Sequence, residues 1–354
     1  MNGFASSSPR LAISATQALA LMRCMRRIRA FEDAAEAASQ GGVSAYGQAA
    51  SGQAAVRGPL HLSTGQEAVP AGVCAHLRPD DYLTSTHRGH GHTLAKGASL
   101  EKMMHELFGK ATGFNGGKGG SMHIADFSVG MLGANGVVAA GFPIAVGAAH
   151  AQKLQRASRG DALTACFFGD GAINRGPFLE ALNWAQAFSL PVLFVCEDNR
   201  WSATTESKPV TAGEGASARA HALGIAFIKV DGNDVIAVSH AAEQLVQEVR
   251  SGSGPRLLHA ITYRVKGHVS VDPAKYRDAA VHARMLEDDP ITRYEAQLLK
   301  LFLDDAGIKY ALDAIKKEAF DEVQRALASA HAAPWPAPEQ AYTDIQTIGA
   351  GQWR

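Results

Sequence analysis

Residues 163–202 restrict the possible fold more than any other part of this 354-residue sequence. The stretch opens with the apolar run 163–168, which Gly169 ends so early that the run suits a buried strand better than a helix. Apolar residues then recur at helical spacing over 177–188, and a second apolar run covers 191–196. Strand, helix and strand over this length indicate a βαβ unit. The sequence therefore predicts an α/β fold with a mostly parallel sheet flanked by helices.

Polar residues follow both predicted strands. Gly169, Asp170 and Gly171 come after the first strand, and Asn199 comes after the second. Because a right-handed crossover brings the carboxyl ends of both strands to one edge of the sheet, Asp170 and Asn199 are expected to be neighbours. The glycines allow a ligand to approach the backbone, and the N-terminus of the following helix is expected to face an anion. A carboxylate here would repel a diphosphate unless a divalent cation lay between them, so the motif predicts Mg²⁺ bound by oxygen ligands.

Composition argues against several classes of function. Lysine plus arginine and aspartate plus glutamate are equal at 34 each, so the overall charge favours neither a nucleic acid nor an acidic membrane as partner. Cys24, Cys74, Cys166 and Cys196 are scattered without a C-x-x-C motif, which indicates a reducing compartment, the cytoplasm, and no disulfide framework. The longest nearly uncharged apolar stretch, 136–151, is too short and too rich in glycine to span a membrane, and we expect it to be a buried helix.

Elements are also expected at both ends of the chain. Ser14 and Gln17 can form a capping box at the start of a helix with one apolar face. Strands are expected at 226–230 and 257–265, with a helix over 235–250 between them. The sequence therefore predicts helices and strands on both sides of the central unit.

The segments around these motifs make the pattern far more specific. Residues 61–68 read HLSTGQEA, residues 116–123 read GGKGGSMH and residues 266–273 read KGHVSVDP. Together with the Gly-Asp-Gly motif and Asn199, they resemble the alpha subunit of the thiamine diphosphate-dependent first component of 2-oxo acid and acetoin dehydrogenase complexes. The resemblance covers most of the chain. It implies a thiamine diphosphate-binding fold in which this chain supplies the diphosphate-binding half, with thiamine diphosphate and Mg²⁺ as cofactors.

The resemblance also implies roles for individual residues. His61, His87 and His268 are expected to be catalytic and to face the substrate. Mg²⁺ is expected to bind Asp170, Asn199 and the backbone carbonyl of Trp201. Thiamine diphosphate is expected to contact a larger set, namely His87, Arg88, Gly136, Val138, Asp170, Gly171, Ala172, Asn199, Trp201 and His268. Three positions depart from the family pattern: Arg175 stands where glutamine is usual, Asp198 where asparagine is usual, and Trp201 where tyrosine is usual.

Two other interpretations remain open. His87, His90 and His92 alternate along the chain in a way that also occurs in zinc metallohydrolases. Against a metal site, the run contains no carboxylate, and the charge of Arg88 would repel a cation. The other alternative is a non-catalytic subunit that serves as a scaffold.

A partner chain is expected because a carboxylate must face the aminopyrimidine ring of the cofactor, and no glutamate of this chain lies in a recognisable context for that task. We therefore expect a beta subunit that supplies it, in the α2β2 heterotetramer that the resemblance implies, and a lipoyl-bearing acyltransferase core that receives the acyl unit. The substrate is expected to be a small carbonyl compound. Residues 87–92 and 130–136 resemble the acetoin members, whereas 272–277 resemble the pyruvate members. Acetoin is slightly favoured over pyruvate or a branched-chain 2-oxo acid.

The chain is expected to form one domain over residues 14–354, after a loose N-terminal tail, 1–13. Residues 39–58 are rich in glycine, alanine, serine and glutamine, which predicts a flexible loop that is either disordered or a small lid, with disorder favoured. Residues 333–354 are expected to be an extended tail.

Overall fold

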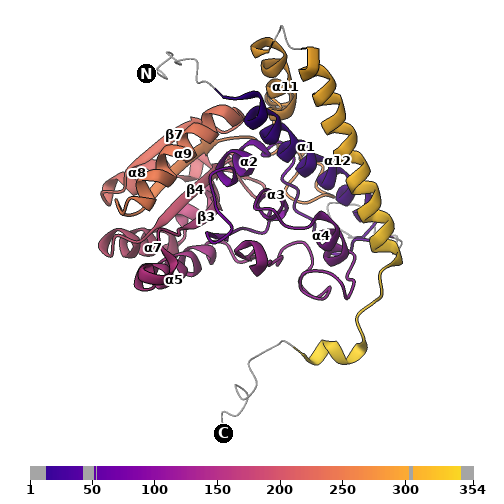
Figure 1. The fold of residues 1–354 in the computed structure, drawn as a ribbon, viewed down its shortest axis with the longest axis horizontal. Helices are drawn as coiled ribbons and strands as arrows, with labels where there is room; N and C mark the ends of the chain where they lie inside the picture. The colour runs from indigo at the N-terminus through magenta and orange to yellow at the C-terminus, as the bar shows by residue number, and fades with distance from the viewer. Residues whose placement is uncertain (1–12, 43–51, 53, 303–305, 344–354) are drawn as a thin grey trace.

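The centre of the molecule is a parallel six-stranded sheet with the strand order β2-β1-β3-β4-β8-β7. The computed structural model describes residues 13–42, 52, 54–302 and 306–343 (Figure 1). The sheet consists of β1 (Tyr82–Thr84), β2 (Met131–Gly133), β3 (Thr164–Gly169), β4 (Val192–Asp198), β7 (Phe227–Asp231) and β8 (Arg256–Ile261). A separate antiparallel hairpin is formed by β5 (Trp201–Ser202) and β6 (Thr205–Glu206). The predicted α/β class is confirmed.

Helices cover both faces of this sheet. Figure 1 shows α5 and α7 side by side, and α1 and α12 packed together away from them. The α-helices are α1 (Ala15–Ser39), α2 (Ala68–Cys74), α3 (His90–Ala95), α4 (Leu100–Leu107), α5 (Gly141–Leu154), α6 (Arg156–Arg159), α7 (Gly176–Ala187), α8 (Ala216–Ala222), α9 (Val235–Arg250), α10 (Ala279–Glu287), α11 (Pro290–Leu301) and α12 (Ala306–Ala332). Short 3-10 helices are η1 (Phe127–Val129), η2 (Asp170–Asn174), η3 (Lys208–Val210) and η4 (Pro338–Tyr342).

Each face of the sheet has its own hydrophobic core. Along β3, Ala165 and Phe167 belong to one core and Cys166 and Phe168 to the other, because successive side chains point to opposite faces. The first core includes side chains of α1, α2, α4, α9 and α12, and the second includes side chains of α5, α7 and α8. Burial on both faces explains why β3 and β4 are almost continuously apolar in sequence.

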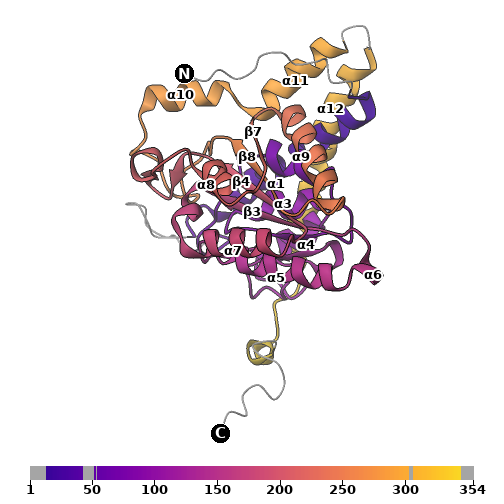
Figure 2. The ribbon, with the colours of Figure 1, turned by 90° about the vertical axis from the view of Figure 1, so that its left-hand side faces the viewer.

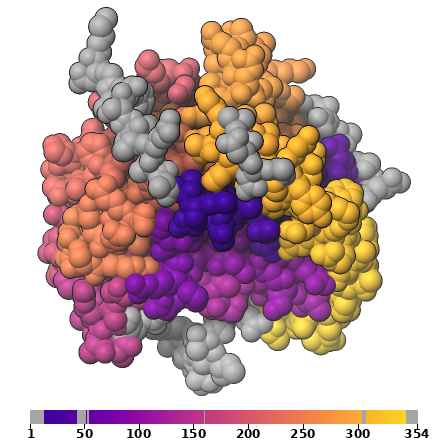
Figure 3. All heavy atoms as spheres, turned by 45° about the horizontal axis from the view of Figure 1, so that its top comes forward, coloured from indigo at the N-terminus to yellow at the C-terminus, as the bar shows by residue number. Residues whose placement is uncertain are grey.

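Helix α1 begins at the predicted capping box. The Ser14 hydroxyl accepts a hydrogen bond from the backbone N–H of Gln17 at 3.3 Å, and the Ser14 backbone N–H donates to the Gln17 side chain at 3.2 Å. Met25, Ile28 and Phe31 are fully buried along its apolar face. Helix α1 reaches the surface near its start, as an indigo patch bordered by the orange and yellow C-terminal helices in Figure 3. It packs against the C-terminal helices α11 and α12 and also against α2 and α3.

Two expected boundaries are corrected by the structure, and a third is confirmed. The helix expected over 136–151 begins only at Gly141, because the preceding residues form bends and turns in which Ala139 has a φ of 77°. The helix expected over 177–188 is confirmed as α7, and the 3-10 helix η2 separates it from β3. The strand expected to run to residue 265 ends at Ile261.

The segment 39–58 lies only partly within the described residues, since 43–51 and 53 are outside them. Ser39 is the last residue of α1. Val56 is buried in the first core, and its N–H donates to the carbonyl of Ala38 at 3.0 Å. The described end of this segment therefore packs against α1.

The C-terminal segment is described as far as residue 343, and residues 1–12 and 344–354 lie outside the described part. After α12, the carbonyl of Pro334 accepts a hydrogen bond from the N–H of Ala111 at 3.0 Å. The segment then forms η4, which lies away from the body of the molecule in Figures 1 and 2. The expected tail is thus helical over residues 338–342 and not extended throughout.

The predictions about membranes and cysteines can be compared with the structure. Among the described residues, no helix combines the length and the apolar character that crossing a membrane requires. All four cysteines are free thiols. Cys166 and Cys196 are buried in β3 and β4, within the apolar runs that were predicted to be strands.

Candidate active site

A cavity of about 220 Å³ opens at the carboxyl ends of β1, β3 and β4. This is the edge at which open parallel sheets bind their ligands. The cavity is lined by every residue that the sequence predicted for the site: His61, His87, Arg88, Gly136, Val138, Asp170, Gly171, Ala172, Asn199, Trp201 and His268. Side chains from distant parts of the chain thus meet at one place.

Asp170 directly follows β3, and Asn199 directly follows β4, the neighbouring strand in the sheet. Asp170 is buried, and its Oδ2 accepts a hydrogen bond from the Ser207 hydroxyl. The Asn199 amide nitrogen donates to Gln66 Oε1 at 3.0 Å, and the Asn199 Oδ1 accepts from the Trp201 N–H at 3.1 Å. Burial raises the pKa of Asp170 to about 6, because the carboxylate loses its hydration. A cation beside Asp170 would offset this cost.

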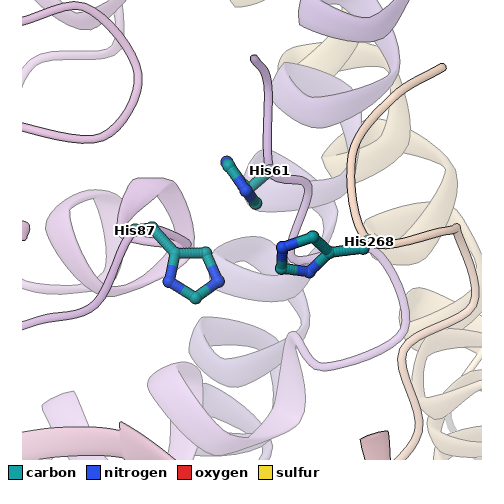
Figure 4. Close-up of side chains that lie close together, drawn as sticks. All are labelled: His61, His87 and His268. Atoms are coloured by element: carbon teal, nitrogen blue, oxygen red, sulfur yellow. The ribbon is translucent and has the colours of Figure 1, made fainter. Parts of the chain in front are cut away.

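Three imidazole rings converge on the cavity from separate segments (Figure 4). The ring centroids of His61 and His87 are 4.5 Å apart, those of His61 and His268 are 4.8 Å apart, and those of His87 and His268 are 5.5 Å apart. Burial and the positive charge of Arg88 lower the pKa of His61 to about 2, of His87 to about 3 and of His268 to about 4. The three rings are therefore neutral near pH 7.

Two buried guanidinium groups line the same cavity. Arg88 donates to the carbonyl of Leu62 and, at 3.3 Å, to that of His268. Arg264 donates to the carbonyl of Ala203 at 2.9 Å and to His268 Nδ1 at 3.4 Å. Neither guanidinium forms an ion pair with a carboxylate of the described residues, and burial lowers the pKa of Arg88 to about 9. Buried cations without a counter-ion favour the binding of an anion.

The histidines that alternate with His87 point elsewhere. His90 is fully buried, and its Nδ1 and Nε2 are both hydrogen-bonded at 2.9 Å. His92 is hydrogen-bonded through Nδ1 at 2.7 Å and through Nε2 at 3.1 Å. Their partners are, in this order, Glu32, Ser121, Ser85 and Glu197. The zinc site that the alternation suggested is therefore not formed, because His90 and His92 have no free nitrogen for a metal.

Backbone groups form the rest of the wall. A Cβ atom at Gly171 would lie 2.4 Å from the Ser202 Oγ, so only glycine allows the β5–β6 hairpin to approach so closely. Ala172 follows within η2. Gly136 and Val138 belong to the turns before α5, and Val138 is 47% exposed. Both residues line the cavity.

Two further residues of this cavity, Arg264 and Gln66, were not predicted from the sequence. Arg264 lies four residues before His268, and Gln66 lies within the HLSTGQEA segment and holds Asn199. A charged arginine near the end of the predicted strand 257–265, followed closely by a candidate histidine, is a signal that could have identified Arg264. Gln66 offers no comparable signal, because its contact with Asn199 joins residues that are far apart in sequence.

The structure explains two of the three departures from the family pattern. The Asp198 carboxylate accepts a hydrogen bond from Nε2 of the buried His259 at 2.9 Å, and its charge makes this contact stronger than the one an amide oxygen would form. The Trp201 ring lies 5.3 Å from the Tyr276 ring, so a larger aromatic group is accommodated. Arg175 is exposed at the start of α7, and nothing in the structure explains it.

Similar proteins narrow the class of protein that this fold and cavity define. Residues 43–339 match the protein family described as dehydrogenase E1 component. The chain is 40% identical to the alpha subunit of acetoin:2,6-dichlorophenolindophenol oxidoreductase from Bacillus subtilis, over 95% of both chains. It is 42% identical to the corresponding subunit from Cupriavidus necator, over 83% of this chain and 87% of that one. It is also 38% identical to the pyruvate dehydrogenase E1 component subunit alpha-3 of Arabidopsis thaliana, over 83% of this chain and 70% of that protein.

The fold and the cavity define a parallel α/β protein with a buried cationic site at the carboxyl ends of its strands. The chain belongs to the dehydrogenase E1 component family. It is an alpha-type subunit of a thiamine diphosphate-dependent oxidoreductase, and its partner is a beta-type subunit.

Proposed function

We propose that this chain, with its beta subunit, uses thiamine diphosphate and Mg²⁺ to cleave acetoin and to transfer the resulting two-carbon unit to lipoamide. The observation that carries the proposal is the cavity itself, in which Asp170 and Asn199 lie with two buried guanidinium groups and three neutral imidazoles. The choice of acetoin is supported by the relatives from Bacillus subtilis and Cupriavidus necator.

The charges of the cavity fit the cofactor. The guanidinium groups of Arg88 and Arg264 would face the diphosphate, which supplies the counter-ion that they lack among the described residues. The Asp170 carboxylate, the Asn199 amide oxygen and the Trp201 carbonyl are hard oxygen ligands of the kind that Mg²⁺ prefers. The cation would also remove the cost of burying the Asp170 carboxylate.

The remaining residues would orient the cofactor and the substrate. When bound, thiamine diphosphate supplies the electron sink that allows bonds to the carbonyl carbon of the substrate to break. His61, His87 and His268 would face the substrate, and His87 and His268 would also contact the diphosphate. Backbone groups would hold the cofactor at the residues named in the sequence analysis, namely Gly136, Val138, Gly171 and Ala172.

A 2-oxo acid, pyruvate or a branched-chain compound, is the second candidate substrate. It is supported by the similarity to pyruvate dehydrogenase subunits, such as the Arabidopsis thaliana protein. Acetoin is the first candidate because the relatives from Bacillus subtilis and Cupriavidus necator are named as acetoin oxidoreductase subunits.

The proposed assembly is an α2β2 heterotetramer in the cytoplasm that delivers the acyl unit to a lipoyl-bearing acyltransferase core. The beta subunit would supply the carboxylate that faces the aminopyrimidine ring. Within this assembly, residues 14–354 would act as one domain. Neither a nucleic acid nor a membrane is proposed as partner.

The test is reduction of an artificial electron acceptor by this chain co-purified with its beta subunit, in the presence of thiamine diphosphate and Mg²⁺. Acetoin, pyruvate and a branched-chain 2-oxo acid are compared. Acetoin is expected to give the highest kcat/KM. Asp170→Ala is expected to lower turnover at least about 100-fold, because it removes a metal ligand.

The matched control is Asp313→Ala, on the exposed face of α12, which should leave turnover unchanged. Selective turnover of pyruvate would replace acetoin as the proposed substrate. Cofactor binding without turnover of any substrate would favour the scaffold alternative, and turnover that does not depend on thiamine diphosphate would refute the proposed chemistry.

A further inference from the structure

The side-chain amide of Asn199 can bind a cation only through its oxygen, because its NH₂ group offers no lone pair to a metal. Two neighbours contact the two ends of this amide. The backbone N–H of Trp201 donates to Asn199 Oδ1 at 3.1 Å, and Asn199 Nδ2 donates to Gln66 Oε1 at 3.0 Å. An amide oxygen has two lone pairs, so Asn199 Oδ1 keeps one for a cation.

These two contacts exclude the opposite orientation of the amide. In a flipped Asn199, the NH₂ group would face the N–H of Trp201, and two donors cannot form a hydrogen bond with each other. Since Asn199 must turn its NH₂ group to Gln66, Gln66 has to present its oxygen in return. The Gln66 oxygen is therefore the acceptor that matches the orientation a metal ligand requires.

Gln66 and Asn199 meet where bulk water hardly reaches. Gln66 is 1% exposed and Asn199 is 7% exposed, and both line the cavity. A buried NH₂ group that loses its acceptor has to find another partner. Without the Gln66 oxygen, the Asn199 side chain would rotate among several orientations, and only some of them would offer Oδ1 to a cation.

The turn that carries Gln66 is held from two sides. Glu67 is fully buried, and its Oε2 accepts a hydrogen bond from the N–H of Gly65 at 3.0 Å. The Thr64 carbonyl accepts from the N–H of Val265, beyond β8, at 3.1 Å. Gly65 has a φ of 93°, and a Cβ atom there would lie 2.5 Å from a methyl carbon of Val265. Gln66 therefore contacts Asn199 from a fixed backbone.

Another buried glutamine shows what a purely structural role looks like. Gln152 is 2% exposed, its amide nitrogen donates to the Leu163 carbonyl at 3.1 Å, and its oxygen accepts from the Thr164 hydroxyl at 2.8 Å. These contacts lie at the amino end of β3, at the opposite edge of the sheet from the cavity. Gln152 is thus equally buried and equally hydrogen-bonded but touches no expected metal ligand.

We propose that Gln66 is a positioning residue of the cation site, which holds the Asn199 amide with its oxygen free for the divalent cation and so determines how tightly that cation binds. This role rests on the proposed function, because the cation is the Mg²⁺ that accompanies thiamine diphosphate. Gln66 acts through Asn199 and is not itself a ligand.

The experiment uses the complex of this chain with its beta subunit, saturated with thiamine diphosphate. It measures the Kd of Mn²⁺, which prefers the same oxygen ligands as Mg²⁺, by electron paramagnetic resonance. Gln66→Met keeps the length of the side chain but removes the acceptor oxygen, and it is expected to raise the Mn²⁺ Kd about 10- to 100-fold, as the loss of a partner of a metal ligand does. Gln66→Glu keeps an acceptor oxygen in either protonation state, so its Kd should stay within about threefold of the wild type.

Turnover of acetoin gives a second measurement. In Gln66→Met, an Mg²⁺ concentration raised about 100-fold should bring kcat back to that of the wild type, because the affinity of the site is changed and not its chemistry. The matched control is Gln152→Met, which also removes a buried glutamine and should keep the Mn²⁺ Kd of the wild type. If Gln66→Met did not assemble with the beta subunit, Gln66→Asn would replace it, since its amide is one methylene group too short to reach Asn199.

Three outcomes would overturn the role of Gln66. The first is an Mn²⁺ Kd that is nearly unchanged in Gln66→Met. The second is an equal loss of affinity in Gln66→Met and Gln66→Glu, because the shape of the side chain and not its acceptor would then matter. The third is a loss of kcat that additional Mg²⁺ does not restore.

The wild-type complex tests the proposed function separately. Binding of Mn²⁺ without turnover of acetoin would refute the proposed substrate, while the comparison of the Gln66 variants would still decide the positioning role. A wild-type complex that binds no Mn²⁺ in the presence of thiamine diphosphate would refute the proposed function itself and, with it, the role of Gln66. A weaker affinity in Gln66→Met alone supports the role of Gln66 whatever the substrate is.

Discussion

Burial controls the protonation of the histidines in the cavity. His61 is the extreme case, because its ring is almost completely buried and faces Arg88 without a compensating carboxylate. His90, in contrast, is fully buried but is hydrogen-bonded to Glu32. The surroundings of each ring, and not the residue type, therefore decide whether a histidine of this chain is a neutral group of the cavity or part of a buried polar pair.

This difference predicts a pH dependence of stability. The pKa of His61 is about 2 in the folded chain and about 6.5 when unfolded. Below pH 6.5 the unfolded state binds the additional proton, so stability rises with pH and is lost as the pH falls. When the pH is lowered from 6.5 to 5, the wild type is expected to lose about 2 kcal/mol more of its free energy of unfolding than His61→Gln. The variant has no imidazole at this position that could bind a proton on unfolding.

Urea denaturation of the cofactor-free chain at both pH values checks this expectation. His221→Gln, which removes an exposed histidine, is the control and should follow the wild type. Equal losses of stability in the wild type and in His61→Gln would show that His61 is not held neutral by burial.

At the scale of elements, the loop 264–278 positions two groups of the cavity, the Arg264 guanidinium and the His268 ring. Strand β8 ends at Ile261, and the loop 264–278 then brings Arg264 and His268 to the cavity. Arg277 holds this loop, since its guanidinium donates to the carbonyl of Arg264 at 2.8 Å and to that of Val265 at 3.4 Å. The rings of Tyr263, Trp201 and Tyr276 surround the same guanidinium at 5.1, 5.6 and 5.9 Å.

Arg277→Met is therefore expected to loosen the loop 264–278. Amide hydrogen exchange, followed by mass spectrometry, should become at least about tenfold faster over this loop, because hydrogen bonds from a charged donor contribute roughly 1.5–3 kcal/mol. Lys275→Met, an exposed change in the same loop, is the control. Unchanged exchange over residues 264–278 in Arg277→Met would mean that other contacts hold the loop.

The glycine-rich segment 113–120 shows how one buried side chain can shape an element. Glu106, at 0% exposure on α4, accepts hydrogen bonds from four backbone N–H groups at 2.7 to 3.1 Å. The donors are Asn115, Gly117, Gly119 and Gly120. The GGKGGSMH segment therefore surrounds a carboxylate of its own chain, and the motif alone does not reveal this partner.

At the scale of the whole molecule, the cavity is a partial active site. Asp170 and Glu197 are the carboxylates among its lining residues, and Glu197 is already hydrogen-bonded to His92. No lining carboxylate is therefore left to face an aminopyrimidine ring. Apolar side chains on α5 and α7 are also exposed, including Ile144 at 47% and Trp184 at 48%. Both observations agree with an alpha-type chain that needs its beta-type partner.

The chain purified alone is accordingly expected to show no turnover of acetoin or pyruvate, even with thiamine diphosphate and Mg²⁺. Addition of the beta subunit should restore turnover and yield a particle with the mass of two alpha and two beta chains in light scattering. A mixture of the beta subunit with the Asp170→Ala chain is the control, and it should assemble without turnover. Substantial turnover by the isolated chain would contradict the idea of a shared active site.

The fold was largely predictable because its signals are local. The runs 163–168 and 191–196, with the helical pattern between them, correspond to β3, β4 and α7 within a few residues. The expected helix over 235–250 coincides with α9. The boundaries that were wrong, such as the late start of α5, lie where turns with a positive φ replace the helix, and apolar content alone does not reveal them.

By itself, the sequence determined the type and order of the elements and the chemical groups at the strand ends. Hydrophobic periodicity and glycine positions act over a few residues, and a βαβ crossover then brings Asp170 and Asn199 to the same edge. The tertiary structure alone decided which distant groups meet. It separated His90 and His92 from His87 through buried hydrogen bonds, and it placed Arg264 against His268. Such contacts depend on the long-range packing of whole elements, so neither spacing nor residue type along the chain can specify them.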